Sequence, residues 1–386
     1  MGAVFIYPLF LTLLVGCSFP LAYFFELELV SVDVFWLVLL HLGGYCFGAL
    51  IFGFLFFKVG RGPVYGTNVP MRYSMHLGLF VGIALIVYAY YLMGGVPALS
   101  ENVENARVQM KQGVGKYIIF GVGFIYVSIS YLSVMCLKDG SRLARCFLLP
   151  MTWLVVSLLL IGIGYRSLCF FLLVHVVLYF LLCREKLRFK TLLSGKVIAG
   201  TLLLFLVMSL LGYVRYKEGT EGFGALSFFW PLIVYGGNIE LIFDVVGWQG
   251  FSYGEYFMLD MISPVLGDGK FTGHHIKDIL DLKFDGEGVS ITIIGESYLN
   301  FGMLGVFLFG FLIGGVTLLL SKFVFCRGYI YRMFFVIFLV FTIRVITSGT
   351  VLIFWFYLVP VVFAYFFVLF GALLEKSFLM NSCKIY

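Results

Sequence analysis

The chain has 386 residues, of which 62% are hydrophobic and only 12% are charged, with a net charge of +6. Soluble domains carry about a quarter charged residues, so this composition excludes a soluble globular protein. It predicts an all-α polytopic integral membrane protein. The expected partner is the lipid bilayer, and no nucleic-acid partner is expected.

Apolar runs long enough to cross a bilayer, which takes about 20 residues, follow one another along the chain. The first lacks a basic segment before it and more spans follow, so we interpret it as a membrane span and not as a cleaved signal peptide. We predict about ten transmembrane helices (ten to twelve) in one integral membrane domain, 1–386. The expected spans cover residues 4–25, 34–57, 73–93, 116–137, 147–165, 167–183, 197–213, 299–325, 333–349 and 351–374.

The basic residues orient these spans, because Lys and Arg accumulate in cytoplasmic loops. Of the 26 Lys and Arg residues, 16 fall on one side, whereas only 3 of the 20 Asp and Glu residues do. We therefore predict that this side is cytoplasmic and that both termini lie there. The basic segments are 58–72, 138–145, 184–196, 322–332 and the C-terminal tail.

One long segment, 215–298, holds more than half of the carboxylates and is predicted to be a long external loop. Within it, residues 223–246 are apolar but are interrupted by Pro231, the Gly236–Gly237 pair and Glu240. A single crossing there would invert every later span and spoil the charge bias. We therefore expect a re-entrant or interfacial segment, or part of a paired crossing.

Three arginines are candidates for binding an anion at the external membrane boundary. Arg344 lies inside the span 333–349, and an intramembrane arginine marks a functional site by default. Arg166 and Arg215 each follow an apolar helix on the same side, and a guanidinium binds phosphate in a forked geometry. Alternatively, Arg166 and Arg215 only reach toward lipid headgroups. Arg107, on a polar loop, is a weaker candidate.

Three side chains are candidates for a general base, and we rank Glu296 first because it lies at the membrane edge. Glu296 lies where the chain re-enters the membrane, and a partly desolvated carboxylate holds a proton more readily, which suits a base. It could instead pair with one of the arginines. His274 and His275 titrate near neutral pH, although solvated loop histidines are common. The remaining histidines lie in apolar spans and are expected to bond neighbouring helices: His41, His76 and His175.

The eight cysteines include no CxxC pair and none lies in the long polar segment. This pattern disfavours disulfides and a thiolate metal site. Carboxylate spacing typical of calcium loops is absent, and so is a nucleotide-binding motif. We predict no metal and no cofactor.

The order of these features resembles the bacterial oligosaccharide repeat unit polymerases, the O-antigen and capsule polymerase family. The chain has Gly164-Tyr165-Arg166 after a central span, a basic loop, one span to Arg215 and then the long segment. The segment closes on Gly-Glu-Ser-Tyr-Leu-Asn-Phe-Gly-Met-Leu-Gly, residues 295–305, which we call the 295–305 signature. The resemblance covers roughly residues 148–320.

The resemblance implies a glycosyltransferase in the bacterial inner membrane with its active site facing the periplasm. Such proteins transfer a growing glycan from undecaprenyl diphosphate to a new lipid-linked repeat unit, so donor and acceptor are both lipid-linked. A chain-length regulator protein is a further candidate partner. The arginines would stabilise the diphosphate leaving group, and a carboxylate or histidine would deprotonate the acceptor hydroxyl.

Two other functions fit the same residues. A transporter or flippase for lipid-linked oligosaccharides would also use arginines, but it would favour inverted repeats and midplane polar residues. An O-antigen ligase would share the donor chemistry and differ only in its acceptor.

Overall fold

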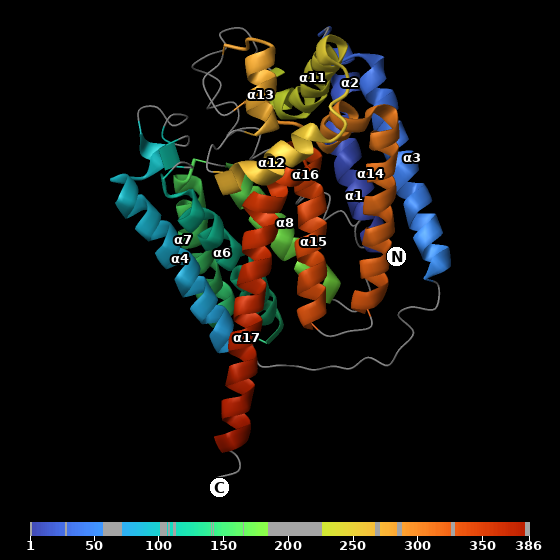
Figure 1. Cartoon of the computed structure of the whole chain (residues 1–386). Coiled ribbons are helices and arrows are strands. Elements are labelled where there is room, and N and C mark those ends of the chain that lie inside the picture. Colours follow the sequence, from blue (N-terminus) through green and yellow to red (C-terminus); the bar gives the residue numbers. More distant parts are fainter. Residues whose placement is uncertain are drawn as a thin grey trace. The chain divides into compact units, whose positions relative to one another are not determined.

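The computed structural model in Figure 1 describes residues 2–382 apart from 28, 57–71, 101–105, 107–108, 111–112, 140, 142, 165, 184–225, 267–270, 284–287 and 326–328. The described residues form helices and no strands, which confirms the all-α prediction. Seven of these helical runs are long and apolar enough to cross a membrane: Ile6–Phe24, Val32–Leu55, Tyr73–Met93, Gly115–Cys136, Ile293–Lys322, Tyr331–Ser348 and Thr350–Glu375.

The chain is a multi-pass membrane protein, and each of these seven runs overlaps a predicted span. Two shorter apolar helices, Leu149–Gly162 and Ser167–Cys183, coincide with two more. The remaining predicted span, 197–213, lies outside the described residues, so the count of ten stays a prediction.

The chain forms two compact units, each with its own packing. Unit 1 comprises Met1–Arg61, Leu187–Phe323 and Phe341–Phe354, and unit 2 comprises Gly62–Lys186, Val324–Val340 and Trp355–Tyr386. The long helix α15, Tyr329–Ser348, belongs to unit 2 in its first part and to unit 1 in its last two turns.

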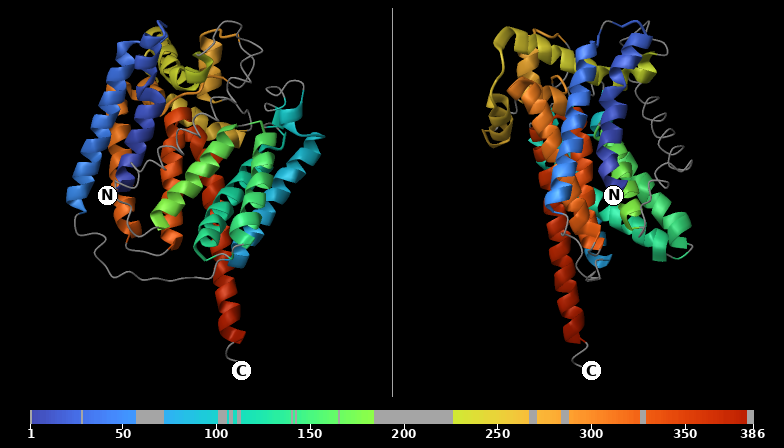
Figure 2. Two further views of the ribbon diagram at one scale, coloured as in Figure 1. Left: turned by 180° about the vertical axis from the view of Figure 1, so that it is seen from behind. Right: turned by 90° about the vertical axis from the view of Figure 1, so that its right-hand side faces the viewer.

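In unit 1 two membrane helices, α3 (Val32–Leu55) and α14 (Ile293–Phe325), lie side by side (Figures 1 and 2). Each carries a Gly-x-x-x-Gly pair at the contact. A methyl group on Gly44 or Gly48 would strike backbone atoms of α14, and one on Gly310 or Gly314 would strike the backbone of α3. Small residues let membrane helices approach until their backbones touch, so these glycines fix the α3–α14 pair.

A buried histidine ties the first span to this pair. The hydroxyl of Tyr7, on α1 (Ile6–Leu11), bonds His41 Nε2 at 2.7 Å, and His41 Nδ1 bonds the carbonyl of Val306 at 3.0 Å. The carbonyl accepts only, so in the neutral ring Nδ1 carries the proton and Nε2 accepts from Tyr7. His41 therefore bonds two neighbouring helices, as predicted.

Unit 2 is a bundle whose helices are joined by polar contacts. Its helices are α4 (Arg72–Met93), α6 (Gly115–Asp139), α7 (Leu149–Gly162), α8 (Arg166–Cys183) and α17 (Val359–Ser382). His175 of α8 bonds Ser130 of α6 through Nδ1 at 2.7 Å, which confirms the second interhelical histidine. Arg332 Nη1 donates to the carbonyls of Leu182 and Cys183 at 3.1 and 3.4 Å.

The described part of the segment 215–298 contains three helices in unit 1: α11 (Leu226–Gln249), α12 (Glu255–Leu266) and α13 (Thr272–Ile279). The helix α11 covers most of the segment 223–246 and is not among the seven candidate spans. Its re-entrant or interfacial placement stays a prediction. The backbone N–H of Ser31 donates to Glu240 at 2.5 Å, so the turn after the first span meets α11, and the charge pattern predicts both on the external side.

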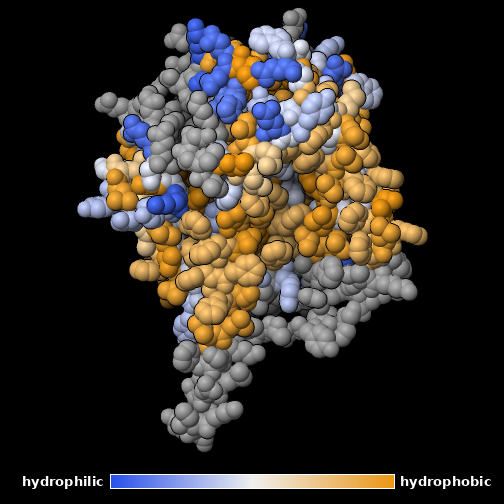
Figure 3. Space-filling view, viewed as in Figure 1, coloured by the Kyte–Doolittle hydropathy of each residue, from blue (hydrophilic) through white to orange (hydrophobic). Residues whose placement is uncertain are grey.

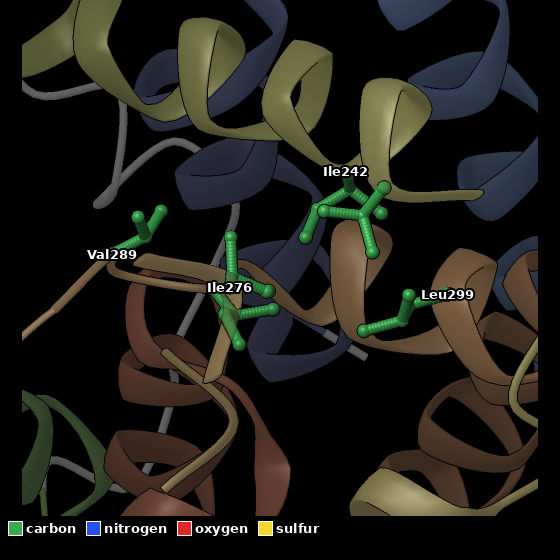
Figure 4. Close-up of a cluster of buried hydrophobic side chains, with 6 residues drawn as sticks. Ile242, Ile276, Val289 and Leu299 are labelled. Atoms are coloured by element: carbon green, nitrogen blue, oxygen red, sulfur yellow. The ribbon is translucent and has the colours of Figure 1, made fainter. Parts of the chain in front are cut away.

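A small apolar core positions α13 against α11 and the start of α14. Figure 4 shows Ile242 of α11, Ile276 of α13 and Leu299 of α14 gathered with Val289. All but Val289 are fully shielded from solvent. Burying each such side chain is worth about 1.5–3 kcal/mol, so the backbone that carries His274 and His275 is held in place by packing.

Candidate functional site

Glu296, in the first turn of α14, holds the start of another membrane helix. Its side chain is 3% exposed. Its Oε2 accepts the backbone N–H of Thr350 at 2.5 Å and also the Thr350 hydroxyl, and Oε1 faces the N–H of Val351 at 3.5 Å. Thr350 begins α16 (Thr350–Ile353), the first turn of the span Thr350–Glu375. A carboxylate stabilises a helix N-terminus because the first N–H groups have no partner inside the helix. We call this contact the Glu296–Thr350 clasp.

The helical backbone is interrupted between α15 and α16, next to this carboxylate. Gly349, at the break, has φ of +76°, and a methyl group there would lie 3.3 Å from the carboxyl group of Glu296. A positive φ and a close neighbour both favour glycine. Arg344 lies one turn before the break, is 9% exposed, and its carbonyl accepts the Thr347 hydroxyl at 3.0 Å. The clasp and the intramembrane arginine thus share one helix junction.

The 295–305 signature encodes a second break, inside α14. Gly302 has φ of 62° and ψ of −153°, so the helical backbone is interrupted there. Asn300 Nδ2 donates to the carbonyl of Glu296 at 2.8 Å, and Asn300 Oδ1 accepts the hydroxyl of Ser252 at 2.8 Å. Gly305 passes so close to the Ser297 carbonyl that a methyl group would collide with it. The signature therefore builds a short polar helix end on a membrane span.

Asp260 is a second buried carboxylate in this region. It lies on α12, is 4% exposed, and accepts the backbone N–H of Thr272 at 2.5 Å. Burial raises the pKa of Asp260 above its ordinary value of 3.8, although the bonds from Thr272 and the attraction to His275 offset part of that rise. Its charge also repels that of Glu296. Two carboxylates therefore share one desolvated region of unit 1.

The two histidines of α13 differ in their surroundings. His274 Nδ1 accepts the backbone N–H of Phe271 at 3.1 Å, so this ring closes the first turn of its own helix. His275 is half-buried, interacts with Asp260, and has its ring 6.4 Å from that of Tyr256. The attraction between the two charges favours the protonated form of an imidazole. Of the two histidines, His275 is therefore the one whose protonation a carboxylate can assist.

The structure does not bring the predicted arginines together, because most of them fall outside what it describes. Arg107 and Arg215 lie outside the described residues. Arg166 is the first residue of α8 in unit 2, and its side chain also lies outside the description. Arg344 belongs to unit 1. Their convergence on one anion stays a prediction.

Two residues of the site were missed in the sequence, Asp260 and Thr350. Asp260 is the single charged residue in the apolar run 256–266, and a lone carboxylate in such a run is a usable signal. Thr350 follows a glycine between two apolar spans, which is typical of a helix start. Neither residue belongs to a recognisable motif, so the sequence does not predict its hydrogen-bond partner.

Among the described residues, no three His, Cys, Asp or Glu side chains gather as a metal ion would need. Comparisons with protein-family models, curated proteins and solved structures give no match to this chain.

Proposed function

We propose that this protein is a membrane glycosyltransferase that polymerises undecaprenyl-diphosphate-linked repeat units into O-antigen or capsular polysaccharide. In this proposal the protein lies in the bacterial inner membrane with both termini cytoplasmic. The polar end of unit 1, formed by α11, α12, α13 and the start of α14, faces the periplasm. A chain-length regulator protein is a candidate partner.

The Glu296–Thr350 clasp is the observation that carries the proposal. It joins the 295–305 signature, on which the family resemblance rests, to the helix junction that follows Arg344. A cation within a membrane span is costly and is retained where it binds something. The substrate of such an enzyme joins a lipid, a diphosphate and a sugar in one molecule. An arginine and carboxylates at the ends of membrane helices can bind its polar part while its lipid part stays in the bilayer.

The proposed reaction forms one glycosidic bond and breaks one. A hydroxyl of the acceptor sugar attacks the anomeric carbon of the donor glycan, and the bond from that carbon to the diphosphate oxygen breaks. Undecaprenyl diphosphate leaves with the electron pair, and Arg344, with Arg166, Arg215 and Arg107 as further candidates, stabilises its negative charge. The hydroxyl proton goes to a base.

The geometry favours His275 as that base over Glu296 and His274. Both Glu296 oxygens face donors at the start of α16, and His274 Nδ1 already accepts a backbone N–H. His275 is half-buried, and the negative charge of Asp260 attracts it, which favours a protonated imidazole.

The test is to reconstitute the purified protein in liposomes with lipid-linked repeat units as the only substrate. A polymerase converts them into a ladder of longer lipid-linked glycans, resolved by gel electrophoresis. Repeat units that remain single would refute the proposal. An O-antigen ligase would extend glycans only onto a separate acceptor, so a second reaction with lipid A-core added distinguishes it.

A transporter for lipid-linked oligosaccharides is the second candidate, because the candidate span Ile293–Lys322 is interrupted at Gly302. A break inside a span resembles the discontinuous helices that line transporter sites. In the same liposomes, a transporter would move the intact repeat unit between leaflets without lengthening it. Access of an added glycosidase to the units measures this movement.

A further inference from the structure

The helix α12 has a polar buried face and an apolar exposed face, the reverse of a helix on the surface of a soluble protein. Its buried face carries Asp260 and Ser263, which are 4% and 3% exposed. Its outer face carries Met258, Met261 and Ile262, which are 60%, 41% and 41% exposed. A helix in contact with water buries its apolar stripe. In Figure 3, hydrophobic side chains gather over the region that α12 occupies in Figure 1.

Ring contacts hold α12 against the membrane helix α14. The ring of Phe257 stacks on Phe301 at 6.0 Å between centroids and on Phe309 at 5.3 Å. Phe309 lies beyond the break at Gly302, well inside the candidate span Ile293–Lys322. The start of α12 therefore lies beside α14 within the length of that span, and Figure 1 shows α12 running crosswise to it.

The apolar surface of α14 continues that of α12. Met303, Leu304 and Leu308 of α14 are exposed, at 65%, 66% and 44%. The exposed face of a membrane-spanning helix contacts lipid acyl chains. Because α12 and α14 touch through Phe257, the lipid that covers one would extend onto the other.

We propose that α12 lies in the membrane interface, with Met258, Met261 and Ile262 among acyl chains and Asp260 and Ser263 facing the protein. Its first turn carries Glu255, whose side chain is exposed. Asp260 then lies on the protein-facing side of α12, with lipid on the other side of the same helix. If the proposed function holds, α12 separates the carboxylates from the lipid carrier.

The test measures what covers the apolar face of α12. In a cysteine-free background of the full chain, Met258→Cys, Met261→Cys and Ile262→Cys each receive a nitroxide label in phosphatidylglycerol–phosphatidylethanolamine liposomes. Molecular oxygen reports lipid contact, and a neutral nickel chelate reports water contact. Leu308→Cys on α14 is the lipid reference, and Asp281→Cys, an exposed loop position, is the water reference.

The proposal predicts that all three α12 labels relax with oxygen as the Leu308 label does, and at least fivefold less with nickel than the Asp281 label. Nickel access equal to that at Asp281 would mean that α12 lies in water and would overturn the proposal. Low access to both reagents would mean that protein, such as a second copy of this chain, covers the face, and would also overturn it. Neither result depends on polymerase activity.

Discussion

Unit 1 and unit 2 bury different kinds of polar groups. The buried charged side chains that the structure describes are Asp260, Glu296 and Arg344, and each belongs to unit 1. The buried polar side chains described in unit 2 are neutral: Ser74, Ser128, Ser130, Ser133 and His175. Both units contain apolar helices long enough to cross a membrane, so membrane packing alone does not account for the difference.

The difference fits the proposal that the reaction takes place in unit 1. Neutral hydroxyls and imidazoles link membrane helices at a gain of about 1 kcal/mol each. A buried charge costs several kcal/mol unless hydrogen bonds or an opposite charge compensate it. The Glu296–Thr350 clasp and the Asp260–Thr272 bond supply such compensation at the polar end of unit 1.

The largest effect is expected from Glu296→Gln. An amide retains one acceptor oxygen but loses the charge at the start of α16, and its NH₂ group would face backbone N–H donors. Because the helix junction next to Arg344 would shift, we expect turnover to fall about 10²-fold and the free energy of unfolding to fall by about 2 kcal/mol. Polymerisation and detergent-phase thermal melting measure the two effects.

Glu375→Gln is the matched control in unit 2, where Glu375 accepts one 3.3 Å bond from Ser74. It should change neither quantity measurably. A Glu296→Gln protein that melts like the wild type but does not turn over would reassign Glu296 from holding α16 to acting as the base.

The two histidines of α13 should separate activity from stability. His275→Ala removes the proposed base, the imidazole that the charge of Asp260 attracts, so polymerisation should fall about 10²-fold or more while the melting temperature changes little. His274→Ala removes the acceptor for the Phe271 N–H and should lower stability by about 1 kcal/mol with most activity retained. The reverse pattern would move the base to His274.

Asp260→Asn should change how stability depends on pH. Burial raises the pKa of Asp260, so the folded protein holds this proton more tightly than the unfolded chain. The free energy of unfolding therefore falls as pH rises from the ordinary aspartate range, about pH 4, through the raised value. Asparagine does not titrate and still accepts the Thr272 N–H, so the variant should lose this decline.

Melting curves across that pH range measure the effect, with Asp281→Asn as the exposed control. Parallel curves for the wild type and Asp260→Asn would show that Asp260 is not desolvated in the folded protein.

The smallest effect is expected in unit 2. Ser130→Ala leaves His175 Nδ1 without its 2.7 Å partner, and stability should fall by about 1 kcal/mol or less with activity unchanged. Ser128, on the same helix, is buried and has no hydrogen-bond partner among the described residues, so Ser128→Ala should cost nothing. A loss of activity in either variant would contradict the division of labour between the units.

The sequence predicted the helical class and most span positions because a membrane helix is a local property of about 20 residues. It also identified Glu296 and Arg344 as unusual, since a charge at the edge of an apolar run is visible without a fold. The link between Glu296 and Thr350 spans 54 residues, and Asp260 meets Thr272 only through the packing of α12 and α13. No local pattern encodes such pairings.

The central claim is that the charged end of unit 1 carries the reaction, and one pair of arginines on α15 tests it most directly. Arg344 lies in unit 1, whereas Arg332 lies in unit 2 and donates to the carbonyls of Leu182 and Cys183. Lysine can replace a donor to carbonyls but not the forked contact with a diphosphate. In liposomes with lipid-linked repeat units, Arg344→Lys should shorten or abolish the glycan ladder, with a rate loss of about 10²–10³-fold, and Arg332→Lys should leave the ladder intact. An intact ladder from Arg344→Lys at wild-type protein levels would contradict the account.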